Sequence, residues 1–352
     1  MGSGQGVPMM AGEPHDKLPP GGGGAAAAGG IAACPLPPEG FDPETAQDEE
    51  LARYGLPIQR AMARNPAASA FRRAFLQRRP GGPPLRFLLA QGPGAGAPPS
   101  GVRPIAAITT WPAHKSVNWS GGYVAPCEGR SFVSVMGAWT VPAVSAPPGG
   151  TATDYRSSTW LGLDGQKSYL DSSLPQTGTL QKWVTSPVAR AEYSAWFQWW
   201  ARGQDNPQYD LPLPVAAGDE IRAIISALDE TTVLVGLRNV TQDAITAFFA
   251  FAPAGRRISG ATAEWIMERP SPMGSDGWEA YELPVYARFA FSGCVAESIA
   301  PGRADLQDHE LEGARLIRMY KLNTDPTSVR TISTARRILA PAPRLEMTYI
   351  GP

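Results

Sequence analysis

Most of the chain alternates between short apolar segments and polar turns. From about His114 onward, runs of Val, Ile, Thr and aromatic residues are separated by Gly, Pro, Asp and Asn. Runs of this length and spacing are typical of the strands of a β-sandwich or β-barrel. The pattern predicts strands at Phe132–Val141, Arg156–Leu163, Ala191–Trp200, Glu220–Leu228, Thr231–Val240, Ala247–Phe251, Ala261–Met267, Val285–Ser292, Ala314–Lys321, Ser328–Thr334 and Arg344–Ile350.

Alternation within these strands gathers polar and aromatic side chains on one face. Successive residues of a strand point to opposite sides, so Trp160, Gly162 and Asp164 face away from Leu161 and Leu163. The same rule groups Ser194, Trp196, Gln198 and Trp200, and it groups Glu264, Ile266 and Glu268.

Two interpretations of this polar and aromatic face remain open. The side chains are either the solvent-facing side of a half-exposed sheet, or they line a groove, because clustered Trp beside carboxylates and amides often marks a binding surface. The pattern alone does not distinguish an enzyme from a sandwich that binds sugar or peptide.

The N-terminal third has a different texture. Residues 1–40 are rich in Gly, Ala and Pro, which is typical of a disordered stretch. Residues 41–79 form a short helical region: one helix is expected from Pro43 to about Tyr54, with acidic residues in its first turns, and another from Pro66 to Gln77. Residues 80–114 are rich in Pro and Gly and indicate a linker, so the β domain covers residues 115–352.

Composition excludes several classes of protein. The net charge of -1 disfavours a nucleic-acid-binding protein, and no apolar run is long enough for a transmembrane helix. The three His share no motif, and with three Cys and neither CxxC nor HExxH a zinc site has few ligands to use. A disulfide between Cys127 and Cys294 and a pair of free thiols are both compatible with the sequence.

A set of motifs, taken in order along the chain, resembles the glutamic peptidases of the eqolisin (G1) family. No single motif is specific, but the ordered set is, and the resemblance covers residues 115–352. The motifs are Asn118-Trp119-Ser120-Gly121-Gly122-Tyr123, Ala138-Trp139-Thr140-Val141-Pro142, Trp160-Leu161-Gly162-Leu163-Asp164-Gly165, Gln176-Thr177-Gly178, Tyr193-Ser194-Ala195-Trp196-Phe197-Gln198-Trp199, Ala217-Gly218-Asp219 and Ala263-Glu264-Trp265-Ile266-Met267-Glu268.

The resemblance implies an all-β fold, a concanavalin-like sandwich of two large antiparallel sheets with a substrate cleft on a concave face. It also implies a catalytic dyad, which the motifs assign to Gln176, in the Gln-Thr-Gly turn, and Glu268. Polypeptides are the implied substrates, a monomer is expected, and no cofactor, metal, nucleic acid or membrane is implied. The residues that we expect to line the cleft are Trp160, Asp164, Trp196, Gln198 and Glu264.

The chemistry of peptide hydrolysis suits these two side chains. A carboxylate such as Glu268 can take a proton from water and later return it to the leaving nitrogen. The amide of Gln176 can donate to the developing oxyanion without a change of charge. A neighbouring carboxylate, Glu264 or Asp164, together with partial burial, is expected to raise the pKa of Glu268. Activity is then expected at acidic pH, as the resemblance also implies.

Two positions depart from the family pattern. The aromatic strand usually reads Trp-x-Glu-Trp, whereas this chain has Gln198 in place of the Glu, and Pro175 restricts the backbone before Gln176. An inactive homologue and a lectin-like sandwich that binds sugar or peptide with exposed Trp therefore stay as alternatives.

The region 41–79 is interpreted as a pro-segment, against the alternative of a disordered extension. Its Arg-rich second helix is expected to pair with cleft carboxylates at neutral pH and to release them on acidification. The chain is then expected to be cut near residues 79–115. Export from the cell is favoured by the family, although the N-terminus shows no clear signal peptide.

Overall fold

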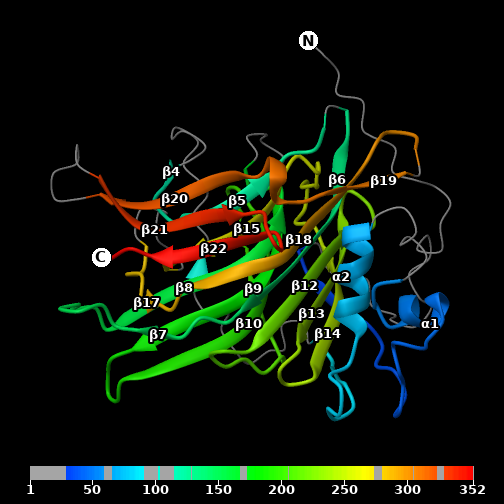
Figure 1. Cartoon of the computed structure of the whole chain (residues 1–352), viewed down its shortest axis with the longest axis horizontal. Helices are drawn as coiled ribbons and strands as arrows, with labels where there is room; N and C mark the ends of the chain where they lie inside the picture. Colours follow the sequence, from blue (N-terminus) through cyan, green and yellow to red (C-terminus); the bar gives the residue numbers. More distant parts are fainter. Residues whose placement is uncertain are drawn as a thin grey trace.

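The computed structural model of the chain describes residues 29–58, 66–90, 102–103, 115–127, 129–166, 173–204, 206–272, 280–303, 305–322 and 329–351. Within these residues, two large and mainly antiparallel sheets pack face to face as a β-sandwich (Figure 1). The predicted all-β fold is therefore confirmed.

The first sheet, called here the front sheet, carries the strands that hold the candidate catalytic residues. It continues at one edge into the second sheet, because β20 pairs with both β5 and β21. In spatial order the front sheet consists of β11 (Gln208–Leu211), β10 (Arg190–Ala201), β9 (Ser173–Val184), β8 (Asp154–Leu163), β15 (Ala263–Glu268), β5 (Trp119–Val124) and β20 (Arg315–Leu322).

The second sheet, called the back sheet, packs behind it. Its strands in spatial order are β21 (Val329–Ile338), β22 (Arg344–Tyr349), β18 (Phe289–Ile299), β6 (Ser131–Thr140), β12 (Glu220–Ala227), β13 (Thr232–Asn239) and β14 (Ala244–Phe251). Shorter elements are β3 (Val102–Arg103), β4 (Lys115–Ser116), β7 (Val144–Ser145), β16 (Ser271–Pro272), β17 (Val285–Tyr286), β19 (Leu306–His309) and a 3-10 turn at Leu311–Gly313.

The main hydrophobic core fills the space between the two sheets. Leu161, Phe197 and Trp265 of the front sheet meet Trp139 and Phe248 of the back sheet there. The Trp265 indole donates to the carbonyl of Met136 over 2.8 Å, at a point where Gly137 leaves room for the ring. The alternation expected from the sequence is thus correct: the odd-numbered residues of β8 face this core, and the even-numbered ones face outward.

The predicted strands agree closely with those observed, but one is divided and others, among them β5 and β9, were not predicted. The expected strand Val285–Ser292 is divided between β17 and β18. The longest front-sheet strands include β9, which the pattern did not predict as a strand at all. The three thiols are free, Cys34 and Cys294 buried and Cys127 exposed, so the disulfide alternative is excluded.

The N-terminal region forms two helices, α1 (Asp48–Arg53) and α2 (Pro66–Leu76). The second helix agrees with the prediction. The first begins at Asp48 rather than Pro43, because the Asp42 side chain accepts the Glu44 N–H at 3.2 Å and holds that stretch in a turn. Residues 1–28 of the predicted disordered stretch lie outside the described residues.

Two short strands occur where the composition predicted no regular structure. β1 (Ile31–Ala33) and β2 (Arg86–Leu88) both pair with the outer edge of β14, one antiparallel and one parallel. The expected pairing of the basic helix with cleft carboxylates is wrong for the two arginines whose ion pairs are seen. Arg72 pairs with Glu297 and Arg79 with Asp243, and both acids belong to the back-sheet region.

Candidate active site

The candidate residues lie on the outward face of the front sheet, the face opposite the main core. Three neighbouring strands, β9, β8 and β15, carry Gln176, Trp160 and the two glutamates. In the register, Gln176 pairs with Gly162, and Gly162 pairs with Glu264, so these three form one row across the sheet. Glu268 lies four residues further along β15 on the same face and pairs with Ser158.

Glu268 is sealed among aromatic and amide groups. Its side chain is only 1% exposed. Trp160 Nε1 donates to Glu268 Oε2 over 2.8 Å, and Asn118 Nδ2 lies 3.4 Å from Oε1. The Ser116 hydroxyl donates to Asn118 Oδ1 over 2.8 Å, which turns the Asn118 amide nitrogen toward the carboxyl group. Asn118 belongs to the first motif of the resemblance but not to the predicted site residues. Its position directly before Trp119 is the signal in the sequence that could have indicated a place beside Glu268.

Burial raises the pKa of Glu268 to about 7, and the hydrogen-bonding groups of Trp119, Trp160 and Asn118 oppose this rise. The Trp119 Nε1 itself completes no hydrogen bond of ordinary geometry with any residue that the structure describes. The expected rise of the pKa and its expected cause in burial are both found, but Glu264 and Asp164, which were expected to add to the rise, are not among its causes. Glu268 carries a proton below neutral pH in this state.

Gln176 is also fully buried, and a second glutamine fixes its orientation. Gln198 Nε2 donates to the carbonyl of Asn206 over 2.8 Å, so Gln198 Oε1 faces the neighbouring strand. Gln176 Nε2 donates to that oxygen over 3.2 Å. The Oε1 atom of Gln176 has no partner among the described residues.

The Gln-Thr-Gly motif is part of a strand and not the turn expected from the sequence. Gln176, Thr177 and Gly178 pair with β8 on one side and with β10 on the other. Pro175 is tolerated because the pairing with β8 ends at Gln176, so the missing N–H of the proline faces no ladder partner on that side. Gly178 is required by packing, since a Cβ there would lie 2.2 Å from the Thr159 carbonyl oxygen.

The remaining acids of the predicted cleft have different environments. Glu264 is fully buried and accepts the Gly165 N–H, and its Oε2 atom meets no hydrogen-bond partner in the described part of the chain. Burial and the nearby Asp164 raise its pKa well above the ordinary value. Asp164, which has a φ of 70°, accepts from Ser259 and Ala261 backbone N–H groups at 2.5 and 2.6 Å. Asp164 thus anchors the turn that leads into β15.

Aromatic side chains pack around these groups on the same face. Trp119 and Trp160 contact edge to face, with ring centroids 5.0 Å apart, and Trp196 joins the same cluster. The tryptophans expected at the cleft are buried rather than exposed, so the interpretation as a half-exposed, solvent-facing sheet is wrong.

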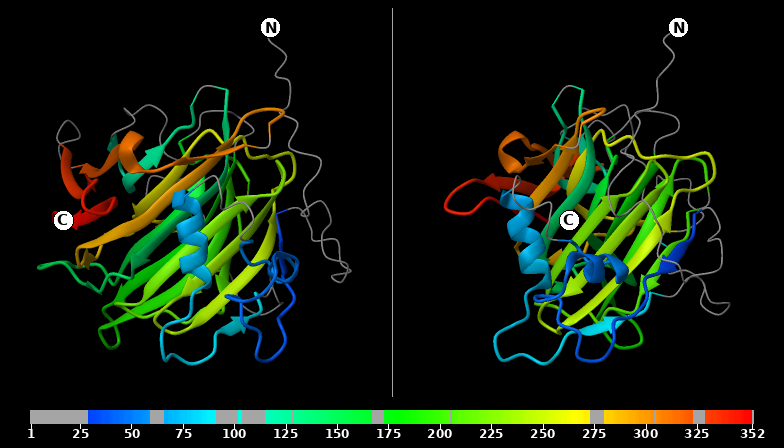
Figure 2. Two further views of the ribbon diagram at one scale, coloured as in Figure 1. Left: turned by 45° about the vertical axis from the view of Figure 1, so that its right-hand side comes forward. Right: turned by 90° about the vertical axis from the view of Figure 1, so that its right-hand side faces the viewer.

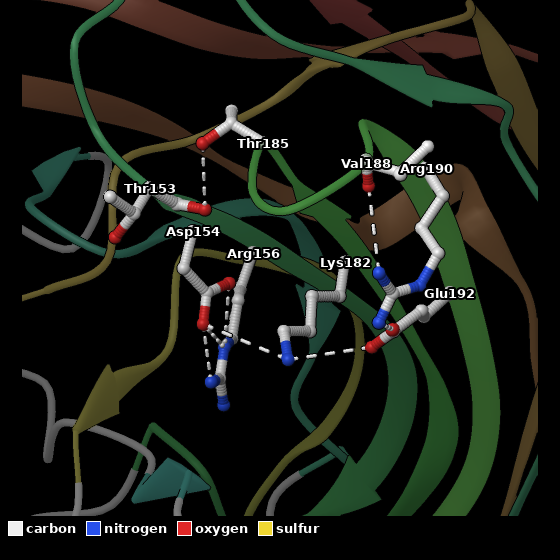
Figure 3. Close-up of polar contacts among 8 residues, drawn as sticks. All are labelled: Thr153, Asp154, Arg156, Lys182, Thr185, Val188, Arg190 and Glu192. Carbon is white, nitrogen blue, oxygen red and sulfur yellow. Dashed lines mark hydrogen bonds and ion pairs between the residues drawn. The ribbon is translucent and has the colours of Figure 1, made fainter.

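A charged network continues this face beyond Glu268 (Figure 3). Ser158 is the register partner of Glu268. Arg156 lies two residues before Ser158, a distance of about 7 Å along β8. It pairs with Asp154 at 2.5 Å, and Lys182 lies 3.9 Å from Asp154 and 3.4 Å from Glu192. These charges mark one end of the candidate site. The short strand β3 also comes near, because it pairs with β16 directly after Arg269 and Pro270.

Within the described part of the chain, no helix is long and apolar enough to cross a membrane. The same residues contain no group of three or more His, Cys, Asp and Glu side chains that could hold a metal ion.

A β-sandwich with a buried glutamate, a buried glutamine and packed tryptophans on one sheet face is the arrangement expected of a glutamic-type endopeptidase. The family model described as the Peptidase A4 family matches residues 117–337, more than half of the chain. The chain belongs to this family of glutamic peptidases.

Individual relatives agree with this assignment. Aspergillopepsin-2 of Aspergillus niger is 25% identical over 225 residues, which is 57% of this chain and 73% of that protein. A crystal structure of Scytalido-glutamic peptidase with a peptide-based transition-state analogue superposes with a TM-score of 0.51 at 18% identity, and covers 66% of this chain and 98% of its own. At that level of identity, the likeness supports the fold alone.

Proposed function

We propose that this endopeptidase hydrolyses peptide bonds with Glu268 as general base and then general acid, and with Gln176 as the oxyanion donor. The observation that carries the proposal is the environment of Glu268, a buried carboxyl held by indole and amide donors on the same sheet face as Gln176. A base with a raised pKa takes a proton from water more readily, and it returns that proton to the leaving amine in the second step.

The Gln176 amide supplies the second part of the mechanism. One amide hydrogen is engaged by Gln198, which sets the plane of the group, and the other hydrogen is available to a developing oxyanion. Trp160, Trp196, Gln198, Glu264 and Asp164 are proposed as the surroundings of the bound polypeptide or as supports for the strands that hold the dyad.

The pH range of this mechanism depends on water reaching Glu268. A base with a pKa of about 7 is mostly protonated at pH 5. Because burial is the main cause of the high pKa, entry of water lowers it toward the ordinary value of a glutamate. We therefore propose that the enzyme is acid-acting in a hydrated state of the site, rather than in the sealed state described above.

Replacement of Glu268 by Gln tests the proposal, with Glu264→Gln as a matched control. Both glutamates lie on the same face of β15 and are fully buried. Glu268→Gln is expected to reduce kcat/KM on an unfolded protein by at least about a thousandfold, because the proton acceptor is lost. Glu264→Gln is expected to keep most of the activity, because the amide oxygen of Gln can still accept the Gly165 N–H that Glu264 accepts.

The reverse result, with Glu264→Gln inactive and Glu268→Gln active, would move the general base to Glu264. Gln176→Ala is expected to lower kcat by about 100- to 1,000-fold. A parent protein that cleaves nothing between pH 3 and pH 7 would instead favour an inactive homologue that binds peptide.

A further inference from the structure

The N-terminal segment, defined as the described residues 29–58 and 66–90, packs on the outer face of the back sheet (Figure 2). This face is on the far side of the sandwich from Glu268. Leu51, Leu56 and the aromatic residues of α2 are buried there against apolar side chains of the back sheet. The back-sheet residues in this second hydrophobic cluster are Met136, Ala138, Ile224, Ile245 and Val295.

The sandwich has glycines at the two points where aromatic residues of α2 make contact. Phe71 enters a bulge of β18, where the register shifts between Ser292 and Val295. A Cβ at Gly293 would lie 2.7 Å from the Phe71 ring. Phe75 packs over Gly236, where a Cβ would lie 3.1 Å from the ring. The shape of the back sheet therefore matches this helix.

A buried ion pair joins the middle of α2 to the same face. The Arg72 guanidinium contacts both carboxylate oxygens of Glu297, and Arg72 Nη1 lies 2.9 Å from Oε1. The Arg72 and Glu297 side chains are 9% and 1% exposed. Loss of one partner of such a pair strongly destabilises the assembly, because it leaves an unpaired charge out of water.

Charged groups of the sandwich also hold both ends of α2. At the N-terminus, Asp308 Oδ2 accepts the backbone N–H groups of Ala67 and Ala68 at 2.9 and 3.1 Å. At the C-terminus, two paired strands supply Arg222 and Arg238. Their guanidinium groups donate to the carbonyl oxygens of Ala74 and Phe75. Each charge has the sign that the helix dipole favours at that end.

Arg238 is buried beneath α2 and donates to it. It is fully buried, burial lowers its pKa to about 10, and its Nε and Nη2 atoms have no partner among the described residues. The Phe75 carbonyl is its hydrogen-bond acceptor. The contact between this guanidinium and α2 is therefore desolvated, and buried arginines of this kind are among the residues that contribute most to an interface.

We propose that residues 29–90 are a permanent structural partner of the β-sandwich and stay bound when the chain between Gln91 and Lys115 is cut. The sandwich carries a docking face whose bulge, glycines and buried charges fit its own N-terminal segment. The cut that was predicted near residues 79–115 then produces two fragments that remain one particle. This proposal concerns docking and does not depend on the catalytic dyad.

The experiment uses the full chain with Glu268→Gln, so that no self-cleavage interferes. A recognition sequence for a site-specific protease is inserted between residues 92 and 101, and cutting is carried to completion, as checked by intact mass. Size-exclusion chromatography at pH 7 is expected to show both fragments in one peak, in equal amounts.

Two adjacent arginines provide a matched pair of variants. Arg73 is exposed, so Arg73→Ala is expected to keep the fragments together after the cut. Arg72→Ala removes the partner of the buried Glu297 and is expected to weaken retention by more than about a hundredfold. If Arg72→Ala does not fold, Phe71→Ala removes only contacts in the β18 bulge and is expected to release the segment as well.

Separate elution of the two fragments of the unmodified segment would overturn the proposal. Equal retention of the segment in Arg72→Ala, Phe71→Ala and Arg73→Ala would do the same, because binding would then not use the described contacts.

Discussion

At the scale of the residue, the protonation of Glu268 links the site to the stability of the fold. The pKa of Glu268 is raised from 4.5 to about 7 by burial, so the folded protein holds a proton that the unfolded chain loses at a lower pH. The contribution of this group to the free energy of unfolding is therefore greatest at low pH and decreases as the pH rises from 4.5 to 7.

Comparison of the parent protein with Glu268→Gln tests this dependence without measuring activity. The Gln side chain does not titrate, so the variant lacks the decrease in the free energy of unfolding that Glu268 causes in the parent. Relative to the parent, its free energy of unfolding is expected to rise by about 3 kcal/mol between pH 4 and pH 8. Urea unfolding at the two pH values measures the difference. A constant difference would show that Glu268 is hydrated in the folded protein.

Gln198 is a second residue whose role depends on which of its side-chain atoms carries hydrogen and donates. Its Nε2 atom donates to the Asn206 carbonyl, which fixes the side chain, and its Oε1 atom accepts from Gln176 and so orients that amide. Gln198→Glu keeps the acceptor but provides the donor only while it is protonated, so its kcat relative to the parent is expected to fall as the pH rises. Gln198→Leu removes both contacts and is expected to lower kcat by about 10- to 100-fold at every pH, with a smaller change in KM.

A pH-rate profile for both variants separates orientation from simple packing. If Gln198→Glu and Gln198→Leu lose activity in parallel at every pH, the side chain fills space and does not position Gln176.

At the scale of the element, the site depends on β9, an interior strand that pairs with β8 on one side and β10 on the other. Gly178 lies in register with Trp160, the residue whose indole binds Glu268, and the close approach of β9 to β8 depends on the missing side chain. A Cβ at Gly178 would lie 2.6 Å from the Trp160 Cβ and 2.2 Å from the Thr159 oxygen.

Gly178→Ala is therefore expected to lower the free energy of unfolding by about 3 kcal/mol, because the new methyl group meets backbone that has no room to move. Gly313→Ala is the control: Gly313 is exposed and a Cβ there meets nothing within 4 Å, so a change below about 0.5 kcal/mol is expected. Thermal or urea unfolding of the two variants measures the contrast.

The sequence was informative about elements wherever one face of a strand is apolar. The alternation in β8, β10 and β15 correctly indicated which residues share the outward face. β9 was missed because Pro175 and Gly178 are typical of turns, and only the pairing partners on both sides explain their presence in a strand. The cause of the Glu268 pKa also depends on burial by residues that are distant in sequence, such as Trp160 and Asn118.

At the scale of the whole molecule, the N-terminal segment was predicted as helices but placed on the wrong face. Charge alone suggested that the arginines of α2 would meet the acidic cleft. Arg72 of α2 and Arg79, which follows the helix, instead meet Glu297 and Asp243, which lie more than 150 positions away in the sequence. Only the folded back sheet, with its bulge at Gly293, indicates where this helix docks.

The pairing of β1 with β14 has a consequence for the order in which the protein is built. Ile31 leaves the ribosome more than two hundred residues before Ala250, its register partner. This stretch is thus made early and is among the last to find its place, and contacts of such long sequence separation form slowly. The apolar side chains of α2 stay uncovered until the back-sheet residues that bury them, among them Ile224, Ile245 and Val295, have been made.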